Sequence, residues 1–141
     1  MKRKGFTLLE LLVVIIIVGV LATLGFQQYA RVIEKSRGAE ARAVLGSIRT
    51  SAAGHYLEHR ALTGFNDDNA GIGAAADQIP SACRGSNYFS YGVNATGDTL
   101  TGTATRCTAS GKTPDASTAF TLTLTSDFAT GSDAWASDFG Y

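Results

Sequence analysis

The first part of the chain is dominated by one long apolar run. Between Phe6 and Phe26 the polar side chains are Glu10 and the hydroxyls of Thr7 and Thr23. These 21 residues, 6 to 26, span roughly 30 Å as a helix, about the thickness of the apolar core of a bilayer. The pattern therefore predicts a membrane-spanning helix at the N-terminal side of the chain.

Three cations, Lys2, Arg3 and Lys4, precede this run and orient the N-terminus towards the cytoplasm. A cleaved secretory signal starts in the same way, but its apolar region is usually shorter and a small-x-small cleavage site should follow, whereas residues 24–27 read LGFQ. A simple membrane anchor fits the length but gives no reason for Glu10, because an ionisable group inside a span costs about 3 kcal/mol. We therefore expect Glu10 to have a partner.

Residues 27–62 keep a helical period. Apolar or small side chains recur every three to four positions, which predicts a helix that packs one stripe against a sheet. The predicted stripe consists of Val32, Ile33, Ser36, Ala43, Val44, Leu45, Ile48, Ala52 and Tyr56. The cations Arg31, Lys35, Arg42 and Arg49 lie largely elsewhere.

Beyond the helix the period changes from helical to alternating. Residues 63–76 are rich in Gly, Asn and Asp and predict a loop. Strands are expected at 88–93, 100–105 and 119–125, with a hairpin loop at 94–98 between the first two. Residues 126–135 read as an acidic loop. The fold class is therefore α+β: a long N-terminal helix packed against three or four antiparallel strands.

The start of the chain resembles a known family. Residues 4–12 read KGFTLLELL, and the basic leader, the Gly-Phe junction, the acid at a fixed distance and the long apolar run together resemble the type III signal of prepilins and pseudopilins. The resemblance implies that a prepilin peptidase cuts after Gly5 and that Phe6 becomes the N-methylated N-terminus. It also implies that Glu10 of one subunit meets the Phe6 amine of a neighbour, so that two charges inside an apolar bundle satisfy each other.

The resemblance further implies a single-pass inner-membrane protein that assembles, with an inner-membrane platform, into an extracellular helical filament of identical subunits. One departure concerns the helix, because many pilins carry a kinking proline late in the apolar run, where this chain has Gln27. Any local unwinding is then expected at Gly19 or Gly25.

Cys83 and Cys107 are the only cysteines. They flank the predicted hairpin and are expected outside the cytoplasm, where a disulfide persists, so we predict a bridge between them. A reactive thiol pair is the alternative, but no C-x-x-C spacing supports it. Many pilins close a disulfide near the chain end, whereas this pair leaves residues 108–141 outside.

Composition and motifs limit the binding and catalytic functions that the sequence predicts. Net charge is zero, so nothing predicts a nucleic-acid partner, and no constellation predicts an enzyme or a cofactor. Residues 55–59 match the H-x-x-E-H zinc pattern, but no glutamate follows Glu58 to complete a catalytic site. Some related pseudopilins bind calcium in a C-terminal loop, for which Asp127, Asp133 and Asp138 are the candidates.

The sequence thus predicts four segments: a leader at 1–5, an apolar helix at 6–26, its amphipathic continuation at 27–62 and a β region at 63–141. The expected function is a structural subunit of a type IV pilus serving adhesion, motility or DNA uptake. The alternatives are a pseudopilin of a type II secretion system and, more distantly, a membrane-anchored periplasmic metalloprotein that uses His55 and His59.

Overall fold

The computed structural model describes residues 6–109 and 119–138, apart from the side chain of Gln27. In these described residues one long helix, α1 (Leu8–His59), is followed by six strands. By its contacts the chain divides into residues 1–34 and residues 35–141, and each unit is described by itself. The predicted α+β class is confirmed.

The helix begins and ends with identifiable signals. Thr7 precedes it and Glu10 lies three residues later, a capping box that satisfies free N–H groups of the first turn. At the other end Arg60 adopts a left-handed conformation with φ of 59°, and its N–H still bonds to the Tyr56 carbonyl at 2.8 Å. The helix therefore stops at His59, slightly before the predicted Leu62.

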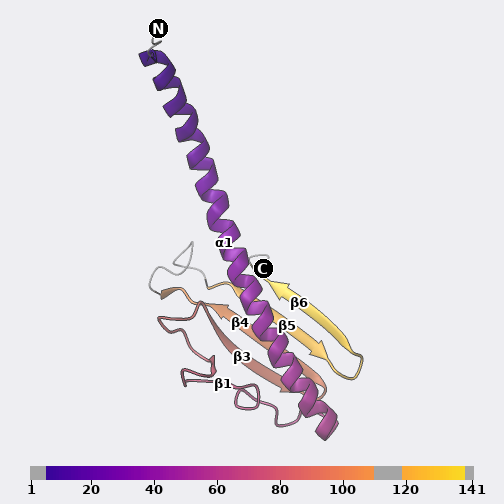
Figure 1. Ribbon diagram of the computed structural model, residues 1–141. Helices are drawn as coiled ribbons and strands as arrows, with labels where there is room; N and C mark the ends of the chain where they lie inside the picture. Colours follow the sequence, from indigo (N-terminus) through magenta and orange to yellow (C-terminus); the bar gives the residue numbers. More distant parts are fainter. Residues whose placement is uncertain (1–5, 110–118, 139–141) are drawn as a thin grey trace, which may run out of the picture. The chain divides into compact units, whose positions relative to one another are not determined.

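Four strands form an antiparallel sheet in the order β3-β4-β5-β6 (Figure 1). Their bounds are Phe89–Thr96 for β3, Thr99–Arg106 for β4, Thr121–Asp127 for β5 and Ser132–Ser137 for β6. A two-residue turn joins β3 to β4, and Gly97 supplies the positive φ of 60° that a type II′ turn requires at its first position. Two short strands, β1 (Ile72–Gly73) and β2 (Ile79–Pro80), pair in parallel within the preceding loop.

The second half of the helix covers one face of this sheet (Figure 1). The core between them consists of Ala41, Leu45, Ile48 and Ala52 from the helix, and of Phe89, Tyr91, Leu100, Ala104, Leu122 and Leu124 from the sheet. Helix and sheet approach closely at Gly102, where a β-carbon would lie 3.1 Å from Cδ2 of Leu45. A glycine in the middle of β4 therefore makes room for a leucine of the helix.

The predicted stripe was right in part. Leu45, Ile48 and Ala52 are buried, but Ala43 is exposed and Ala41 takes its place. Two residues along a helix turn the side chain by about 200°, so Ala43 cannot share a face with Leu45. Val32 is also exposed, at 63%.

The strand prediction needs one larger correction. The acidic loop predicted at 126–135 is wrong, because residues 126–127 belong to β5 and residues 132–135 to β6, leaving only 128–131 as a turn. The Asp127 carboxylate accepts hydrogen bonds from the backbone N–H groups of Ala129 and Thr130 and so shapes this turn. Part of the predicted loop 63–76 is also strand, at β1.

Candidate functional site: the N-terminal assembly motif and the stapled sheet

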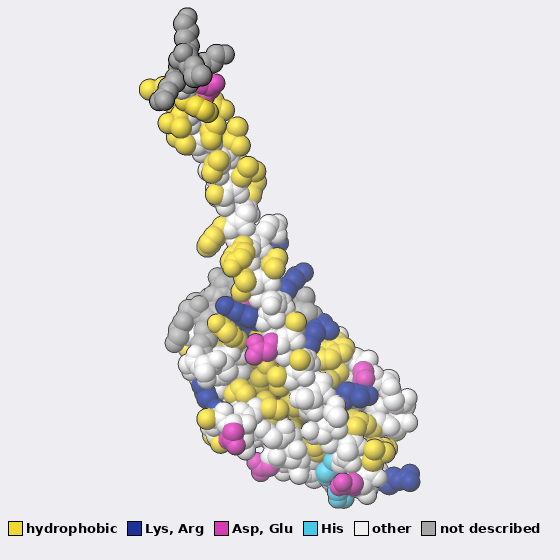
Figure 2. Space-filling model, viewed as in Figure 1, with side chains coloured by type: hydrophobic (Ala, Val, Ile, Leu, Met, Phe, Trp, Pro, Cys, Tyr) yellow, Lys and Arg dark blue, Asp and Glu magenta, His cyan; other side chains and the backbone are white. Residues whose placement is uncertain are grey.

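The apolar half of α1 exposes its side chains on every side. The large hydrophobic residues from Phe6 to Phe26 are 44 to 83% exposed, and apolar side chains cover this part of the helix in Figure 2. It is the described helix that is long and apolar enough to cross a membrane. Both hydroxyls of the segment are bonded, that of Thr7 to Glu10 and that of Thr23 to the Gly19 carbonyl at 2.7 Å. This surface is suited to lipid or to other apolar helices.

Glu10 lies at the start of this surface and bonds locally. Its Oε2 atom accepts a hydrogen bond from the Thr7 backbone N–H at 2.9 Å and from the Thr7 hydroxyl at 2.8 Å. Together with Phe6, Leu9, Val13 and Val14, Glu10 lines a shallow hollow. Thr7 therefore holds the carboxylate in a fixed position beside Phe6, which is 82% exposed.

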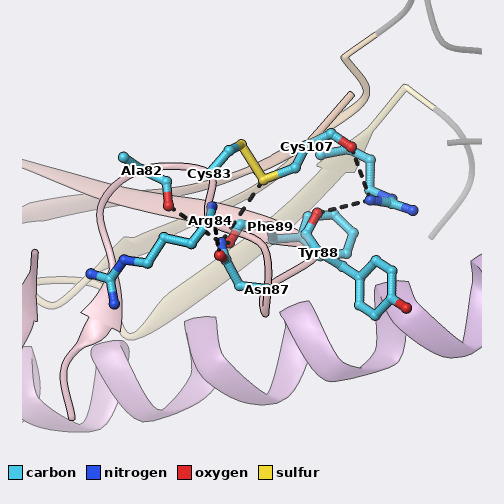
Figure 3. Close-up of a disulfide and its surroundings, with 8 residues drawn as sticks. Ala82, Cys83, Arg84, Asn87, Tyr88, Phe89 and Cys107 are labelled. Carbon is cyan, nitrogen blue, oxygen red and sulfur yellow. Dashed lines mark hydrogen bonds between the residues drawn. A yellow bond between two sulfur atoms is a disulfide. The ribbon is translucent and has the colours of Figure 1, made fainter. Parts of the chain in front are cut away.

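The predicted disulfide is present. Cys83, in the loop before β3, bonds to Cys107, directly after β4, with the two Cα atoms 5.6 Å apart (Figure 3). The backbone N–H of Cys107 also donates to the Tyr88 carbonyl at 2.9 Å. A covalent bond and a hydrogen bond thus join the entrance of β3 to the exit of β4.

Asn87 organises the loop around the bridge. Its Nδ2 donates to the carbonyls of Phe89 at 2.6 Å and Ala82 at 3.3 Å, and its Oδ1 accepts from the Arg84 backbone N–H at 2.8 Å (Figure 3). Arg84 in turn reaches back to the carbonyls of Gly73 at 2.6 Å and Ala75 at 2.8 Å. Two polar side chains therefore fix a long irregular segment that has little regular secondary structure of its own.

Arg106 is a second residue that the sequence reasoning missed. It is 1% exposed, and its Nη1 donates to the carbonyls of Tyr88 at 3.0 Å and Cys107 at 3.1 Å. Its guanidinium also lies 5.0 Å from the centre of the Tyr88 ring. The alternation of β4 carried the signal, because position 106 falls on the same face as buried Leu100 and Ala104.

Comparison with known proteins finds one family model and several relatives. Residues 1–26 match the model of the prokaryotic N-terminal methylation motif. The chain is 32% identical over 75 residues to a fimbrial protein of Neisseria meningitidis serogroup B, covering 53% of this chain and 44% of that protein. It is 32% identical over 83 residues to the type IV major fimbrial protein FimA of Dichelobacter nodosus, covering 59% of this chain and 50% of FimA.

A third relative is the fimbrial protein EcpC of Eikenella corrodens, 34% identical over 74 residues that cover 52% of this chain and 46% of EcpC. The chain is thus similar at its start to proteins with the N-terminal methylation motif and, over about half its length, to fimbrial proteins. The chain spans about half the length of the curated relatives that it matches. No solved structure matches it.

The residues predicted to be processed fall at the edge of the described part. Gly5, the predicted cleavage residue, lies outside the described residues, and Phe6 is the first residue inside them. In the structure Phe6 lies just before the helix and lines the same hollow as Glu10, and the pairing between subunits predicted for them stays a prediction.

The three aspartates predicted as calcium candidates have separate partners. Asp127 accepts backbone hydrogen bonds, first from Thr130, which lowers its pKa. Asp133 forms a salt bridge with Arg49, 2.8 Å from Oδ1 to Nε, and the hydrogen bond from Arg49 lowers its pKa. Asp138 accepts from the hydroxyl of Thr121. Within the described residues no three His, Cys, Asp or Glu side chains come together as a metal site.

The histidine pair at the end of α1 also has local contacts. The rings of His55 and His59 stack with centres 4.2 Å apart, and His59 Nδ1 lies 3.1 Å from the His55 carbonyl oxygen. His55 also meets the edge of the Phe65 ring, 5.5 Å between centres. These contacts explain the pair as packing at the helix end, where histidine also complements the helix dipole.

Proposed function

We propose that this chain is a structural subunit of a type IV pilus, assembled through the apolar half of α1. The observation that carries the proposal is the helix start, where Glu10 and Phe6 lie at one end of a helix that exposes apolar side chains on every side. The match to the methylation motif and the fimbrial relatives support it. In this role the chain has no catalytic function.

The proposed sequence of events begins in the inner membrane. A prepilin peptidase removes residues 1–5 and the new amine of Phe6 is methylated. An assembly platform then extracts the subunit and adds it to a growing filament, which ends up outside the cell. Extraction moves the apolar surface of the helix directly from lipid into a bundle of identical helices, so this surface is never exposed to water.

The charge of Glu10 is proposed to set the stagger between neighbouring subunits. A carboxylate held by Thr7 can accept the Phe6 ammonium of a neighbour without giving up its helix-capping role, because a carboxylate has acceptor capacity for further donors. Inside an apolar bundle an unpaired carboxylate would be strongly unfavourable, so only the stagger that pairs it is stable.

The substitution Glu10→Gln tests the pairing. Glutamine also fits a capping box, so the helix start should survive while the charge is lost. We expect the variant to remain in the membrane and to yield few or no filaments in the sheared fraction. The matched control is Glu58→Gln, which removes an exposed acid from the same helix and should assemble normally. Normal filaments from Glu10→Gln would contradict the assigned role of the charge.

The mass of protein sheared from the cell surface tests the function itself. The expected chain starts at methylated Phe6 and lacks two hydrogens because of the disulfide. A chain that retains Met1, or that begins after Phe26, would contradict the pilus assignment and favour an anchored or secreted soluble domain.

A further inference from the structure

The sheet has a second face, opposite the helix, on which threonines form a regular array. In β4 and β5 the residues alternate between buried positions against the helix and half-buried positions on this face. The register places three threonine pairs directly opposite each other across the two central strands. These pairs are Thr101 with Thr125, Thr103 with Thr123, and Thr105 with Thr121.

The flanking strands continue the face with small side chains. In β3 the positions beside the threonine pairs hold Ser90, Gly92 and Asn94, and in β6 they hold Ala134 and Ala136. The charged residues on this face lie at its ends. Asp127 is in the outermost row at one end, where it caps the turn, and Asp138 directly follows β6 at the other end, where its carboxylate accepts a hydrogen bond from the Thr121 hydroxyl. A protein surface normally carries many charges, so two central threonine pairs without a charged residue, Thr101 with Thr125 and Thr103 with Thr123, require an explanation.

The array has a two-dimensional repeat. Neighbouring strands are about 4.8 Å apart, and alternate residues along a strand are about 6.8 Å apart. Both spacings are close to oxygen repeats on the faces of hexagonal ice. The two threonine strands are adjacent, so sheet twist rotates one row against the other by only about 20–25°.

We propose that this threonine face binds ice. The Thr121 hydroxyl already donates to Asp138, and the other paired threonines each offer a hydroxyl that can replace a lattice water and a methyl group that orders the water beside it. An ion would hold its own hydration shell and disturb a lattice, which accounts for the absence of charge at the two central threonine pairs. The ligand is therefore crystalline water, recognised by matched spacing and by the uncharged centre of the face.

A filament would strengthen the effect of each face. If subunits repeat along a pilus, many identical faces meet one ice surface, and weak single contacts add up through their high effective concentration. This step rests on the proposed pilus function, whereas the affinity of one face does not. The pilus function and the binding of ice by one face can therefore be refuted independently.

The test uses the full chain held in lipid nanodiscs, so that no filament is needed. Ice is grown slowly from the solution, and the fraction of protein taken into the ice is compared with that of empty nanodiscs. The variant Thr103→Tyr/Thr123→Tyr places two bulky rings on one opposed pair at the centre of the face. The control Thr50→Tyr/Thr63→Tyr adds the same rings at exposed positions outside the sheet.

We expect the unsubstituted protein and the control to be enriched in ice, and the face variant to fall to the level of empty nanodiscs with its disulfide and circular dichroism unchanged. If the tyrosine pair prevents folding, Thr101→Lys/Thr125→Lys tests the same face. Absence of enrichment in the unsubstituted protein, or equal enrichment of the face variant, would overturn the proposal. A third outcome is that the unsubstituted protein is not enriched in ice and that sheared filaments of the face variant no longer bundle side by side. This outcome would assign the face to contacts between filaments and would also overturn the proposal of ice binding.

Discussion

Removal of the disulfide should destabilise the sheet unit by a predictable amount. The bridge joins residues 24 positions apart, and closing a loop of that length reduces the entropy of the unfolded chain by an amount worth about 3.5 kcal/mol at 25 °C. Cys107 is buried and Cys83 is exposed, so replacing both by alanine adds only a small loss of packing. We therefore expect Cys83→Ala/Cys107→Ala to lose about 3 to 4 kcal/mol.

The assay is guanidinium unfolding of the full chain in detergent, followed by the fluorescence of the single tryptophan, Trp135. This residue reports on β6, and its ring lies 4.9 Å from the Arg42 guanidinium carbon of the helix, so its signal should change when sheet and helix separate. Thermal unfolding should shift in parallel by on the order of 15 to 25 °C.

Reduction of the unsubstituted protein is the matched control, because it breaks the bridge without changing any side-chain volume. Reduced protein and the double variant should unfold at similar denaturant concentrations. A loss below about 1 kcal/mol in both would refute the reasoning, because it would mean that the β3–β4 pairing and the Asn87 contacts already restrict the unfolded chain as much as the bridge does.

Three further predictions concern the same unit and can be measured in the same unfolding assay. Leu45→Ala removes a fully buried side chain that packs over Gly102, and should cost about 2 to 5 kcal/mol; a smaller loss would show that the sheet closes onto the helix. Burial raises the pKa of Tyr91 to about 12, so the fold should lose about 1 to 3 kcal/mol as the pH rises from 10 towards 12, and Tyr91→Phe should remove that loss; unchanged alkaline sensitivity would exclude Tyr91 as its source. The hydrogen bond from Arg49 lowers the pKa of Asp133, so the Arg49–Asp133 pair should stabilise the fold at neutral pH and lose this effect as the pH falls through the lowered pKa. Asp133→Asn should cost no more than about 1 kcal/mol of stability at neutral pH, because both side chains are partly exposed. A larger loss would contradict a surface ion pair.

The parts of the fold that the sequence predicted are those with a local cause. The helix follows from an uninterrupted apolar run and a helical period, and β4 and β5 follow from alternation of threonine with apolar or small residues. The disulfide was predicted from the presence of two cysteines and from their expected place outside the cytoplasm.

The parts that it missed depend on contacts between distant residues. Strand β6 contains an acid and small residues and shows no apolar alternation, but it is held by pairing with β5 and by Arg49, whose side chain bonds to Asp133, 84 positions away. Likewise Arg84 bonds to carbonyls around β1, which no short-range pattern could reveal. The predicted stripe contained Ala43 and left out Ala41 for a simpler reason. It included residues on both sides of Leu45, which cannot all lie on one face of a helix.

The position of the bridge also determines how the chain can respond to tension. When a chain is pulled at its two ends, only the residues outside a covalent loop can extend. The Cys83–Cys107 bridge prevents the segment between the two cysteines from extending, and this segment would contribute about 80 Å of extended chain. Strands β5 and β6 lie beyond the bridge and can be drawn out completely, whereas β3 and β4 remain tied to each other at one end. Under force the C-terminal strands would therefore detach first and leave a covalently closed hairpin against the helix.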